Sequence, residues 1–533
     1  MKKIILSIIT FSLIAVSCSD FIEKDERGIQ TLENYFQTSQ ECENYVNELT
    51  RRLLIPNDWY TLLAPRLTNE SATDDAWMGN TGQDSGAFRP CAQYIVSPDN
   101  MGSMNSIYTA HYYTIQSANL GLEKMAGSPI TDAQRNQYVG ESLFIRAYCY
   151  YELVNNFGSV PLYTKSLGTA DLKLERSPVA DIYAQIEADL KESAAKLEDI
   201  PVARNGRVNK WAAYALLARV SLFQEKWAEA KQYSNKVITE GPFALESDFL
   251  KIWDVNNHNG IESILEAQTS SVQDKDLGSS IATFSGARGE DKKNFPSNDA
   301  QDVLDGWGWC MPTSDLENAY LSENDVIRRR STITKWGEAA YGDEVLNPTH
   351  KFSLNDNKSG RICRKYYIPI ATRRALDKKD NHLPLNVPLI RLAEMYLTRA
   401  EANYHTGGDA LADINVIRAR VKLDPKTGLS GPTLLKQIYK ERRLELAFEG
   451  LRLFDIRREK DPTTGRPVIE GLMGPNGTFV QYNLNSTDPY ETTNLRESQD
   501  KGINFNPAKN LLWPIPQIEI DLSGGLITQN AGY

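Results

Sequence analysis

The sequence contains few cysteines, and none is spaced for metal binding or redox chemistry. Only 6 of 533 residues are Cys, and no two stand in the C-x-x-C spacing of a zinc or redox site. Cys18 directly follows an apolar N-terminal segment, and an odd number remain: Cys42, Cys91, Cys149, Cys310 and Cys363. We therefore expect most of these five to be small buried residues.

Catalytic motifs are also missing. There is no H-E-x-x-H, G-x-S-x-G or G-x-x-x-x-G-K-[ST], and the five histidines are isolated. His405 lies in an expected helix, which favours packing or capping over ligation. Asp74 and Asp75 are adjacent on one loop, whereas the carboxylates of a glycosidase flank a bond from opposite sides. Glu441 and Glu445 lie one helical turn apart amid arginines, an ordinary ion-pair pattern. We predict that the protein is not an enzyme.

Metal and nucleic-acid sites have little support. Residues 355–360 (NDNKSG) mimic the start of a calcium loop, but the twelfth position of that frame is Tyr366 instead of Glu. We predict a turn there, with no metal and no cofactor; a structural calcium ion is compatible with the sequence but not supported by it. The net charge is −10 without a basic cluster, which argues against nucleic-acid binding.

The strongest positive signal is a helical apolar pattern in residues 140–162. Apolar residues recur there at steps of four and three, the spacing of one helix face: Leu143, Ala147, Tyr150, Val154 and Phe157. Further aromatic residues widen this face, so the helix must be covered by others. Gly158 and Pro161 predict where it ends.

Helical pairs recur later in the chain. Residues 208–240 predict two antiparallel helices, and residues 388–421 repeat the plan. Ala218 and Ala230 are twelve residues apart, as are Ala400 and Ala412, and small residues at that spacing let paired helices approach closely, as in tetratricopeptide repeats. We expect the repeats mainly over 105–240 and 388–455.

Two stretches lack a helical period. Residues 60–100 and 242–387 are rich in Gly, Asn, Asp, Ser and Pro with short apolar pieces, and long irregular loops are usually functional. We predict a mainly α fold in which helical repeats carry an irregular, loop-rich half with short strands.

The N-terminus reads as a lipoprotein leader. Residues 1–17 combine two lysines with an apolar run too short for a stable membrane span. The sequence AVSC at 15–18 resembles a bacterial lipobox, which makes Cys18 the lipidated residue. Residues 18–30 would then be a flexible, acidic tether, similar to the export signals of Bacteroidetes surface lipoproteins, and 31–533 the folded domain.

Several stretches, in this order, resemble the SusD/RagB family of surface lipoproteins. They are the lipobox, ESLFIRAYCYYELVNNFGSVPL from Glu141, GWGWCMPTSDLENAYLSENDVIRRRSTI from Gly306, PLIRLAEMYLTRAEA from Pro388, IYKERRLELAFEGLRLFDIRR from Ile438, and LLWPIPQIEIDLSGGLITQNAGY at the C-terminus. The resemblance implies tetratricopeptide-like repeats that hold an irregular ligand-binding half. It also implies a lipid-anchored protein on the cell-surface side of the outer membrane, which binds glycans and passes them to a SusC-like TonB-dependent transporter.

Sugar binding needs an aromatic face for the pyranose ring and polar side chains for its hydroxyls. In the family, glycan sites draw on the first loop and on the insertion. We expect Trp307 and Trp309 to point to opposite sides, with Trp307 structural, and Tyr94 to begin a strand. The candidate glycan-contact residues are Trp77, Asp75, Asn80, Arg89, Trp309, Trp336 and Tyr341.

The sequence thus predicts capture of oligosaccharides or polysaccharide at the cell surface and delivery to the transporter. Two alternatives stay open: a peptide-binding member, as the RagB side of the family suggests, and an envelope scaffold that uses only its helical repeats.

Overall fold

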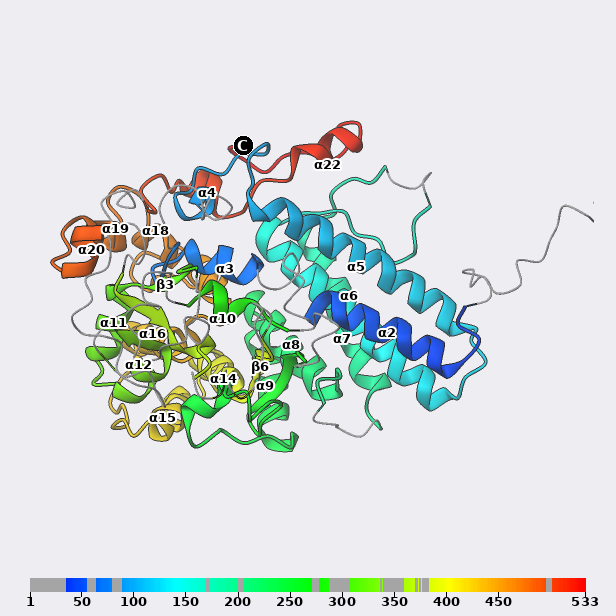
Figure 1. The fold of residues 1–533 in the computed structure, drawn as a ribbon, viewed down its shortest axis with the longest axis horizontal. Coiled ribbons are helices and arrows are strands. Elements are labelled where there is room, and N and C mark those ends of the chain that lie inside the picture. Colours follow the sequence, from blue (N-terminus) through cyan, green and yellow to red (C-terminus); the bar gives the residue numbers. More distant parts are fainter. Residues whose placement is uncertain are drawn as a thin grey trace, which may run out of the picture.

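The structure is a computed structural model. It describes residues 35–54, 64–78, 89–168, 173–199, 205–270, 278–286, 307–335, 338, 359–369, 372, 375, 383–494 and 501–533. Helices α2, α5, α6 and α7 form one side of the molecule, at the right of Figure 1, and short strands with small helices form the other side.

The long helix expected around residues 140–162 is α6 (Asp132–Phe157), and the prediction is confirmed. Its N-terminus carries a capping box in which Thr131 and Gln134 satisfy each other's backbone N–H groups. Gly158 ends it with a φ of 72°, a conformation that suits glycine. Nearly all side chains from Tyr138 onward are buried, because α6 packs between α5 (Ser103–Ala126), α2 (Ser39–Leu54) and α7 (Val179–Lys196).

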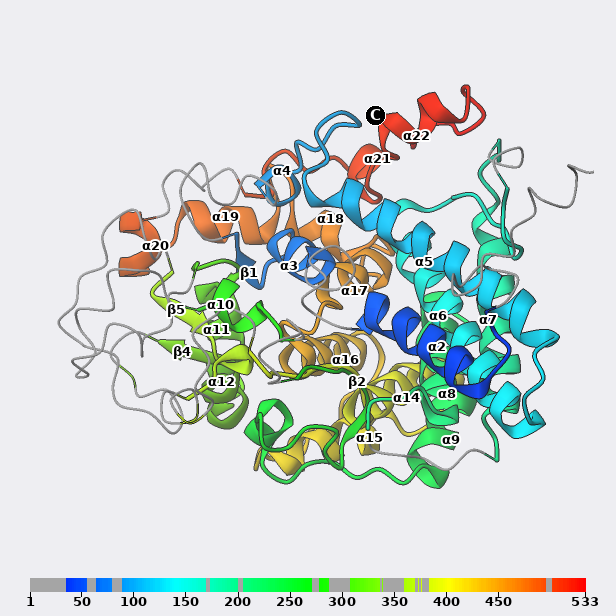
Figure 2. The ribbon, with the colours of Figure 1, turned by 45° about the vertical axis from the view of Figure 1, so that its right-hand side comes forward.

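Consecutive helices continue from α6 as an array in which each packs on the next. The order of contact is α5, α6, α7, α8, α9, α14 and α15, with α16 against α14 and α15. The further members are α8 (Lys210–Phe223), α9 (Trp227–Glu240), α14 (Leu392–Thr406), α15 (Ala410–Arg420) and α16 (Gly431–Leu446). The expected helical pairs therefore join into one frame across the long insertion (Figure 2).

Small residues lie at the joint between α9 and α14, with one exception to the prediction. Ala230 and Ala402 are fully buried in one apolar cluster, and Ala218 and Ala400 are also buried. Ala412 is exposed, so it does not take part in the helix contact that its spacing predicted. His405 stacks on Trp227 with ring centroids 3.8 Å apart, which confirms its packing role.

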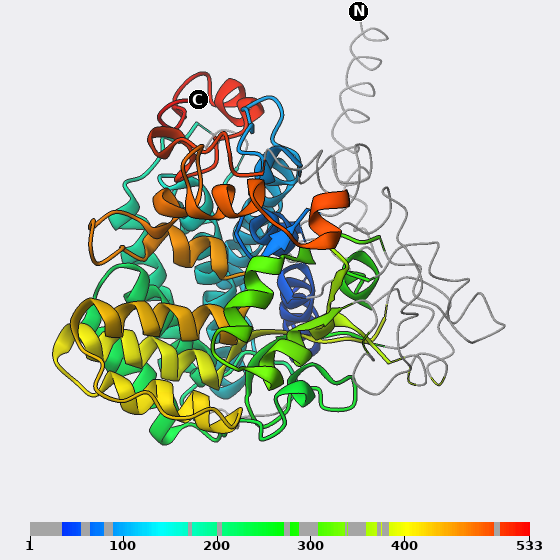
Figure 3. The ribbon, with the colours of Figure 1, turned by 90° about the vertical axis from the view of Figure 1, so that its left-hand side faces the viewer.

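The insertion begins and ends on a single two-stranded sheet. Strand β2 (Ser263–Ala267) pairs antiparallel with β6 (Val387–Arg391), which leads directly into α14. The prediction that residues 388–391 start a helix is therefore wrong, because they form the second strand of this stem. In Figure 3 the yellow to orange helices of the frame lie beside the green segments of the insertion.

Smaller elements fill the irregular half. The strands are β1 (Ala76–Trp77), β3 (Met311–Pro312), β4 (Ile333–Lys335) and β5 (Arg361–Cys363). The helices are α3 (Ala64–Ser71), α4 (Arg89–Ala92), η3 (Phe249–Trp253), α10 (Ile281–Phe284), α11 (Ser314–Leu321), α12 (Val326–Thr332), η6 (Arg364–Tyr366), α17 (Arg452–Arg458), α18 (Val468–Leu472), α19 (Thr478–Leu484), α20 (Pro489–Asn494), α21 (Pro507–Asn510) and α22 (Gln517–Leu522).

The stretch 60–100 differs from the exposed loop that its composition predicted. Residues 64–71 form a helix, and side chains from Arg66 to Met78 are buried. Lys501 lies among them and donates hydrogen bonds to the carbonyls of Ser71, at 2.7 Å, and Ala76. Burial lowers the pKa of this ammonium group to about 7. The polar residues from Arg66 to Met78 therefore lie inside the protein and are not exposed for a ligand.

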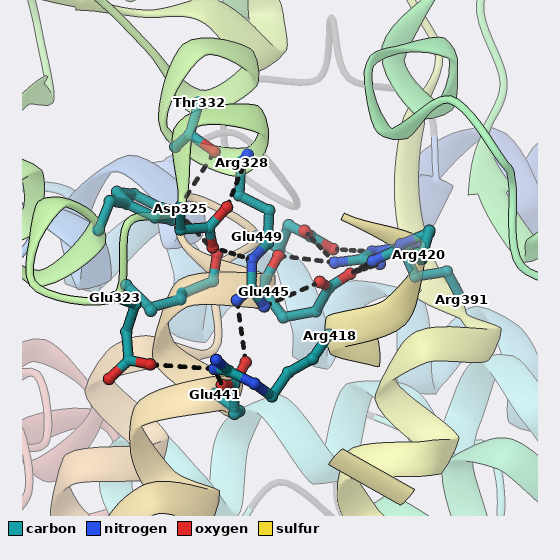
Figure 4. A network of polar contacts seen from close by, with 12 residues as sticks. Glu323, Asp325, Arg328, Thr332, Arg391, Arg418, Arg420, Glu441, Glu445 and Glu449 are labelled. Atoms are coloured by element: carbon teal, nitrogen blue, oxygen red, sulfur yellow. Dashed lines mark hydrogen bonds and ion pairs between the residues drawn. The ribbon is translucent and has the colours of Figure 1, made fainter. Parts of the chain in front are cut away.

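A buried ion network joins the insertion to the frame (Figure 4). Arg391, at the end of β6, contacts Glu262 at 2.7 Å, Glu445 at 2.6 Å and Glu449 at 2.8 Å. Arg420 from α15 also contacts Glu262 and Glu445. The pattern of Glu441 and Glu445 predicted ordinary pairing along one helix, and this is wrong: both are fully buried and bind arginines of other elements.

The five described cysteines are buried and free, as predicted. None of the helices in the described part of the chain combines the length and the apolar character that crossing a membrane requires.

Replacing Arg391 with methionine should lower the free energy of unfolding by about 3–5 kcal/mol, because it leaves buried carboxylates without their cation. Urea unfolding followed by circular dichroism measures the effect. Lys191→Met is the matched control: its ion pair with Glu187 has a half-exposed lysine, so a change of at most about 0.5 kcal/mol is expected. Equal loss in both variants would contradict the network's role.

Candidate functional site

A short sheet brings together the two stretches that the sequence assigned to the ligand. Strands β1 and β3 pair antiparallel, with Ala76 opposite Pro312 and Trp77 opposite Met311. The backbone N–H of Thr313 also donates to the carbonyl of Asp75 at 3.0 Å. The segment 307–310 enters β3 directly, so both tryptophans of the GWGW sequence lie just before the strand that pairs with the strand containing Trp77.

Three aromatic rings form a cluster at this point, which we call the aromatic cluster: Phe284, Trp307 and Trp309. The ring centroids of Phe284 and Trp307 are 4.6 Å apart, those of Phe284 and Trp309 5.2 Å, and those of the two tryptophans 4.8 Å. Trp307 is 38% exposed, whereas Trp309 and Phe284 are each 6% exposed. One indole therefore lies at the surface on a rigid aromatic base.

Backbone hydrogen bonds fix the cluster. The N–H groups of Trp307 and Trp309 donate to the carbonyls of Thr283, at 2.9 Å, and Phe284, at 2.7 Å. Gly308 between them has a φ of 67°, which favours glycine. The segment 307–309 is thereby tied to α10, and the Trp307 side chain needs little ordering when a ligand arrives.

The sequence prediction for the two tryptophans is wrong in two respects. Their rings lie on the same side and contact each other edge to face. The expectation of opposite sides is also wrong for an extended strand, in which residues two apart share one face. Trp309 is the buried ring that supports the cluster, and Trp307, predicted to be structural, is the exposed one.

Trp77 does not form a surface platform. It is 2% exposed and packs with Met311, Ile362 and Tyr367. Its indole N–H donates to Glu491 at 3.0 Å. The predicted sugar contact at Trp77 is therefore corrected: both faces of the ring are used within the protein.

Asp75 is also internal. It accepts a hydrogen bond from Arg443 at 2.7 Å, and Asp74 accepts from Arg452 at 2.8 Å. Burial acts to raise the pKa of both carboxyls; Arg443 and Arg452 outweigh it at Asp74, whose pKa lies well below the usual range, whereas the pKa of Asp75 is raised. Both side chains are fully buried, so the ligand contact predicted for Asp75 is corrected.

The remaining candidates divide into two groups. Arg89 begins α4 and is half-buried. Tyr94 does not begin a strand: it is 3% exposed, and its hydroxyl donates to the carbonyl of Ala72 at 2.5 Å. Asn80, Trp336, Tyr341 and Cys18 lie outside the described residues.

No group of three or more His, Cys, Asp or Glu side chains arranged for a metal ion occurs in the described ranges. Residues 351–358, which include most of the calcium-like sequence, are not among those ranges.

Glu317, a carboxylate that the sequence analysis did not single out, connects several elements of the irregular half. Glu317 of α11 accepts hydrogen bonds from Arg329 at 3.1 Å and Arg361 at 2.7 Å, so it joins α11 to α12 and β5. Burial acts to raise the pKa of Glu317, but Arg361, Arg329 and Lys335 lower it to about 2. Arg361 also donates to Asp488 at 2.7 Å. A local pattern contains no signal for these contacts, because each partner comes from a distant segment.

Comparisons with known proteins agree with this architecture. A family model described as "SusD family" matches residues 262–533, and a second, described as "Starch-binding associating with outer membrane", matches residues 30–222. The chain is 26% identical to "SusD-like protein P2" of Formosa agariphila, with 100% of each chain covered. It is 28% identical to "Starch-binding protein SusD" of Bacteroides thetaiotaomicron, over 81% of this chain and 84% of that protein.

Solved structures share the fold. A "Laminarin binding SusD-like protein" superposes with a TM-score of 0.72 at 26% identity, over 93% of this chain and 99% of that one. "Surface glycan-binding protein A from Bacteroides thetaiotaomicron in complex with laminarihexaose" gives a TM-score of 0.72 at 20% identity, over 92% and 99% of the two chains. This second likeness concerns the fold alone.

Replacing Glu317 with glutamine should reduce stability at neutral pH and flatten its acid dependence. Because the folded-state pKa is depressed to about 2, the carboxylate contributes stability above pH ~4.5 that is lost as pH falls toward ~2. We expect a loss of about 2 kcal/mol at pH 7 that shrinks as the pH approaches 2. Chemical unfolding at several pH values measures it.

The exposed Glu240 provides the control for this prediction, since its ion pair with Lys236 lies on the surface of α9. Glu240→Gln should leave the pH profile unchanged. A constant difference between Glu317→Gln and the unmodified protein from pH 7 to pH 2 would contradict the assigned role.

Proposed function

The chain belongs to the SusD family, and from this premise we propose that it is a cell-surface glycan-binding protein that captures oligosaccharides or polysaccharide. The observation that carries the proposal is the half-exposed Trp307 indole on its buried base of Phe284 and Trp309. An indole face of this kind packs against the apolar C–H side of a pyranose. The relatives named for starch and laminarin binding support the same class of ligand.

The aromatic cluster suits binding that must be strong enough to hold a sugar and weak enough to release it. The Trp307 ring is already ordered, so association loses little side-chain entropy. Its partial exposure leaves only part of the indole surface for the ligand, which limits the affinity of one site. Several sugar units contacting neighbouring loops would then add to the affinity of a polysaccharide.

Binding without cleavage fits the carboxylates of this region. Asp74 and Asp75 are fully buried in contact with Arg443 and Arg452, and Glu491 accepts hydrogen bonds from Trp77 and Ser314. Glycoside hydrolysis needs two carboxyl groups that face the bond to be broken from opposite sides. The chain is therefore proposed to bind its glycan without changing it.

The proposal includes a destination for the ligand. The glycan passes to a SusC-like TonB-dependent transporter in the outer membrane, and the lipid on Cys18 keeps the binding protein at that membrane. The family models, one of which is described as associating with the outer membrane, support this placement. Multiple acyl chains on one cysteine give lasting attachment.

Trp307→Ala should weaken glycan binding by about ten-fold or more while the protein stays folded, because it removes the exposed anchor and leaves the buried pair of Phe284 and Trp309 in place. Calorimetry or affinity electrophoresis against a panel of polysaccharides, including starch and laminarin, measures binding. Val416→Ala is the matched control, since Val416 has the same 38% exposure on α15; it should bind as the unmodified protein does. Trp309→Ala should instead cost about 3–5 kcal/mol of stability.

Two results would overturn the proposal. Tight binding of peptides with no binding of any glycan would identify a peptide carrier, and release of new reducing ends from a bound glycan would identify an enzyme. Unchanged glycan affinity in Trp307→Ala would remove the aromatic cluster from the site.

Cys18→Ala should release the protein from the outer membrane, because no acyl chain can then be attached. Fractionation of the source cells, together with labelling of intact cells by a membrane-impermeant reagent, measures the effect. The matched control is Ser17→Ala, which leaves the cysteine in place and should remain membrane-bound. Continued membrane attachment of Cys18→Ala would contradict the proposed anchor.

A further inference from the structure

A second concave surface lies away from the aromatic cluster, on elements that the proposed function does not use. It is a pocket of about 360 Å³ between the N-terminal half of α5, the segment after α6, and α22 near the C-terminus. Helix α22 lies beside α5 at the edge opposite α15 (Figures 1 and 2). We call it the tyrosine pocket, after the side chains that dominate its lining: Tyr108, Tyr112, Tyr113 and Tyr163.

The tyrosine rings that line the pocket contact one another and so hold one another in place. Tyr112 and Tyr163 are stacked, with centroids 5.9 Å apart and planes 15° from parallel, and Tyr108 lies 4.8 Å from Tyr112. The Tyr112 hydroxyl donates to the carbonyl of Pro161 at 2.8 Å, which fixes that ring. Tyr113 is 66% exposed at the mouth. Electron-rich faces arranged around one space attract cations.

One carboxylate lines the same pocket. Glu519 of α22 is half-buried, and its side chain has no hydrogen bond or ion pair with any residue of the described ranges. Burial raises the pKa of this carboxyl group. Taking a carboxylate out of water without a partner is unfavourable. A cation bound beside Glu519 would therefore stabilise the ionised carboxylate.

Arg176 is a basic group close to Tyr108 and Tyr112. Its guanidinium group, however, donates to the carbonyls of Ser159, at 2.6 Å, and Thr528, at 2.9 Å, and to the side chain of Asn530. All three acceptors are neutral, and the guanidinium is held by them instead of by Glu519.

The C-terminal edge of the pocket, which we call the rim, carries exposed apolar side chains. Leu522 lines the pocket and is 71% exposed, and its neighbours in the sequence, Ile518 and Leu526, are 53% and 40% exposed. Exposed apolar side chains gathered around a pocket are typical of surfaces that meet another protein. A basic residue between apolar neighbours would place its charge at Glu519 and its flanking side chains on this rim.

We propose that the tyrosine pocket receives a lysine or arginine side chain of a partner protein. The ammonium or guanidinium group lies among the tyrosine rings against Glu519, its methylene stem lines the pocket, and apolar residues beside it cover the rim. The assignment does not depend on glycan binding, since it uses different elements and different chemistry.

Short capped peptides test the proposal without knowledge of the partner. The probes are a pentapeptide with one lysine between two leucines, the same peptide with norleucine in place of lysine, and n-butylammonium. Calorimetry with the mature protein should show the lysine peptide binding about ten-fold or more tightly than either of the other two, because only it supplies both the charge and the rim contacts.

Variants tie this binding to the pocket. Glu519→Gln should weaken the lysine peptide about ten-fold and leave the norleucine peptide unchanged. Leu522→Ala should weaken both peptides and not n-butylammonium. Glu192→Gln, at a side chain 57% exposed on α7, is the matched control and should change nothing.

Each of the other possible results would contradict a specific part of the proposal. If the norleucine peptide binds as tightly as the lysine peptide, or Glu519→Gln has no effect on the latter, the pocket does not select a cation. If n-butylammonium binds as tightly as the lysine peptide, the pocket is a small-molecule site and no protein partner is needed. If none of the probes binds, the proposal fails altogether.

Discussion

The buried ion network around Arg391 is the constraint on which the rest of the molecule depends. Its arginines come from β6, α12 and α15, and its carboxylates from the residue before β2, from α16 and from the turn after α16. Each charge is costly to bury alone and acceptable only when all its partners are present. If one of these segments moved away, buried charges on several other segments would lose their partners. The network therefore holds the insertion and the helical frame in one arrangement.

This coupling explains how loops far apart in the sequence reach one surface. The β2–β6 stem fixes both ends of the insertion on the helical array, and the β1–β3 pairing then fastens its middle to the N-terminal stretch. Hydrogen bonds from Arg329 and Arg361 to Glu317 also connect α11, α12 and β5. The aromatic cluster of Phe284, Trp307 and Trp309 is therefore tied to α10 by backbone hydrogen bonds and leads into β3.

The candidate site shows where local patterns are informative and where they are not. The sequence singled out GWGW and the stretch around Trp77, and the structure brings them together through two strands of two residues each. It predicted the wrong tryptophan as the exposed one, because Trp307 and Trp309 differ only in what covers them. It also misjudged Asp75, since a carboxylate on a polar loop looks the same whether its partner is water or Arg443 of a distant helix.

The sequence by itself determined the long helices of the frame and the family. A run such as 140–162 buries its apolar face wherever it is placed, and capping at Thr131 and termination at Gly158 are local interactions. Only the tertiary structure decided which polar and aromatic side chains face solvent, because that depends on segments hundreds of residues away. Burial of Trp77, pairing of Glu441 with arginines beyond its own helix, and the position of Glu519 in a pocket lined by tyrosines all arise from such distant contacts.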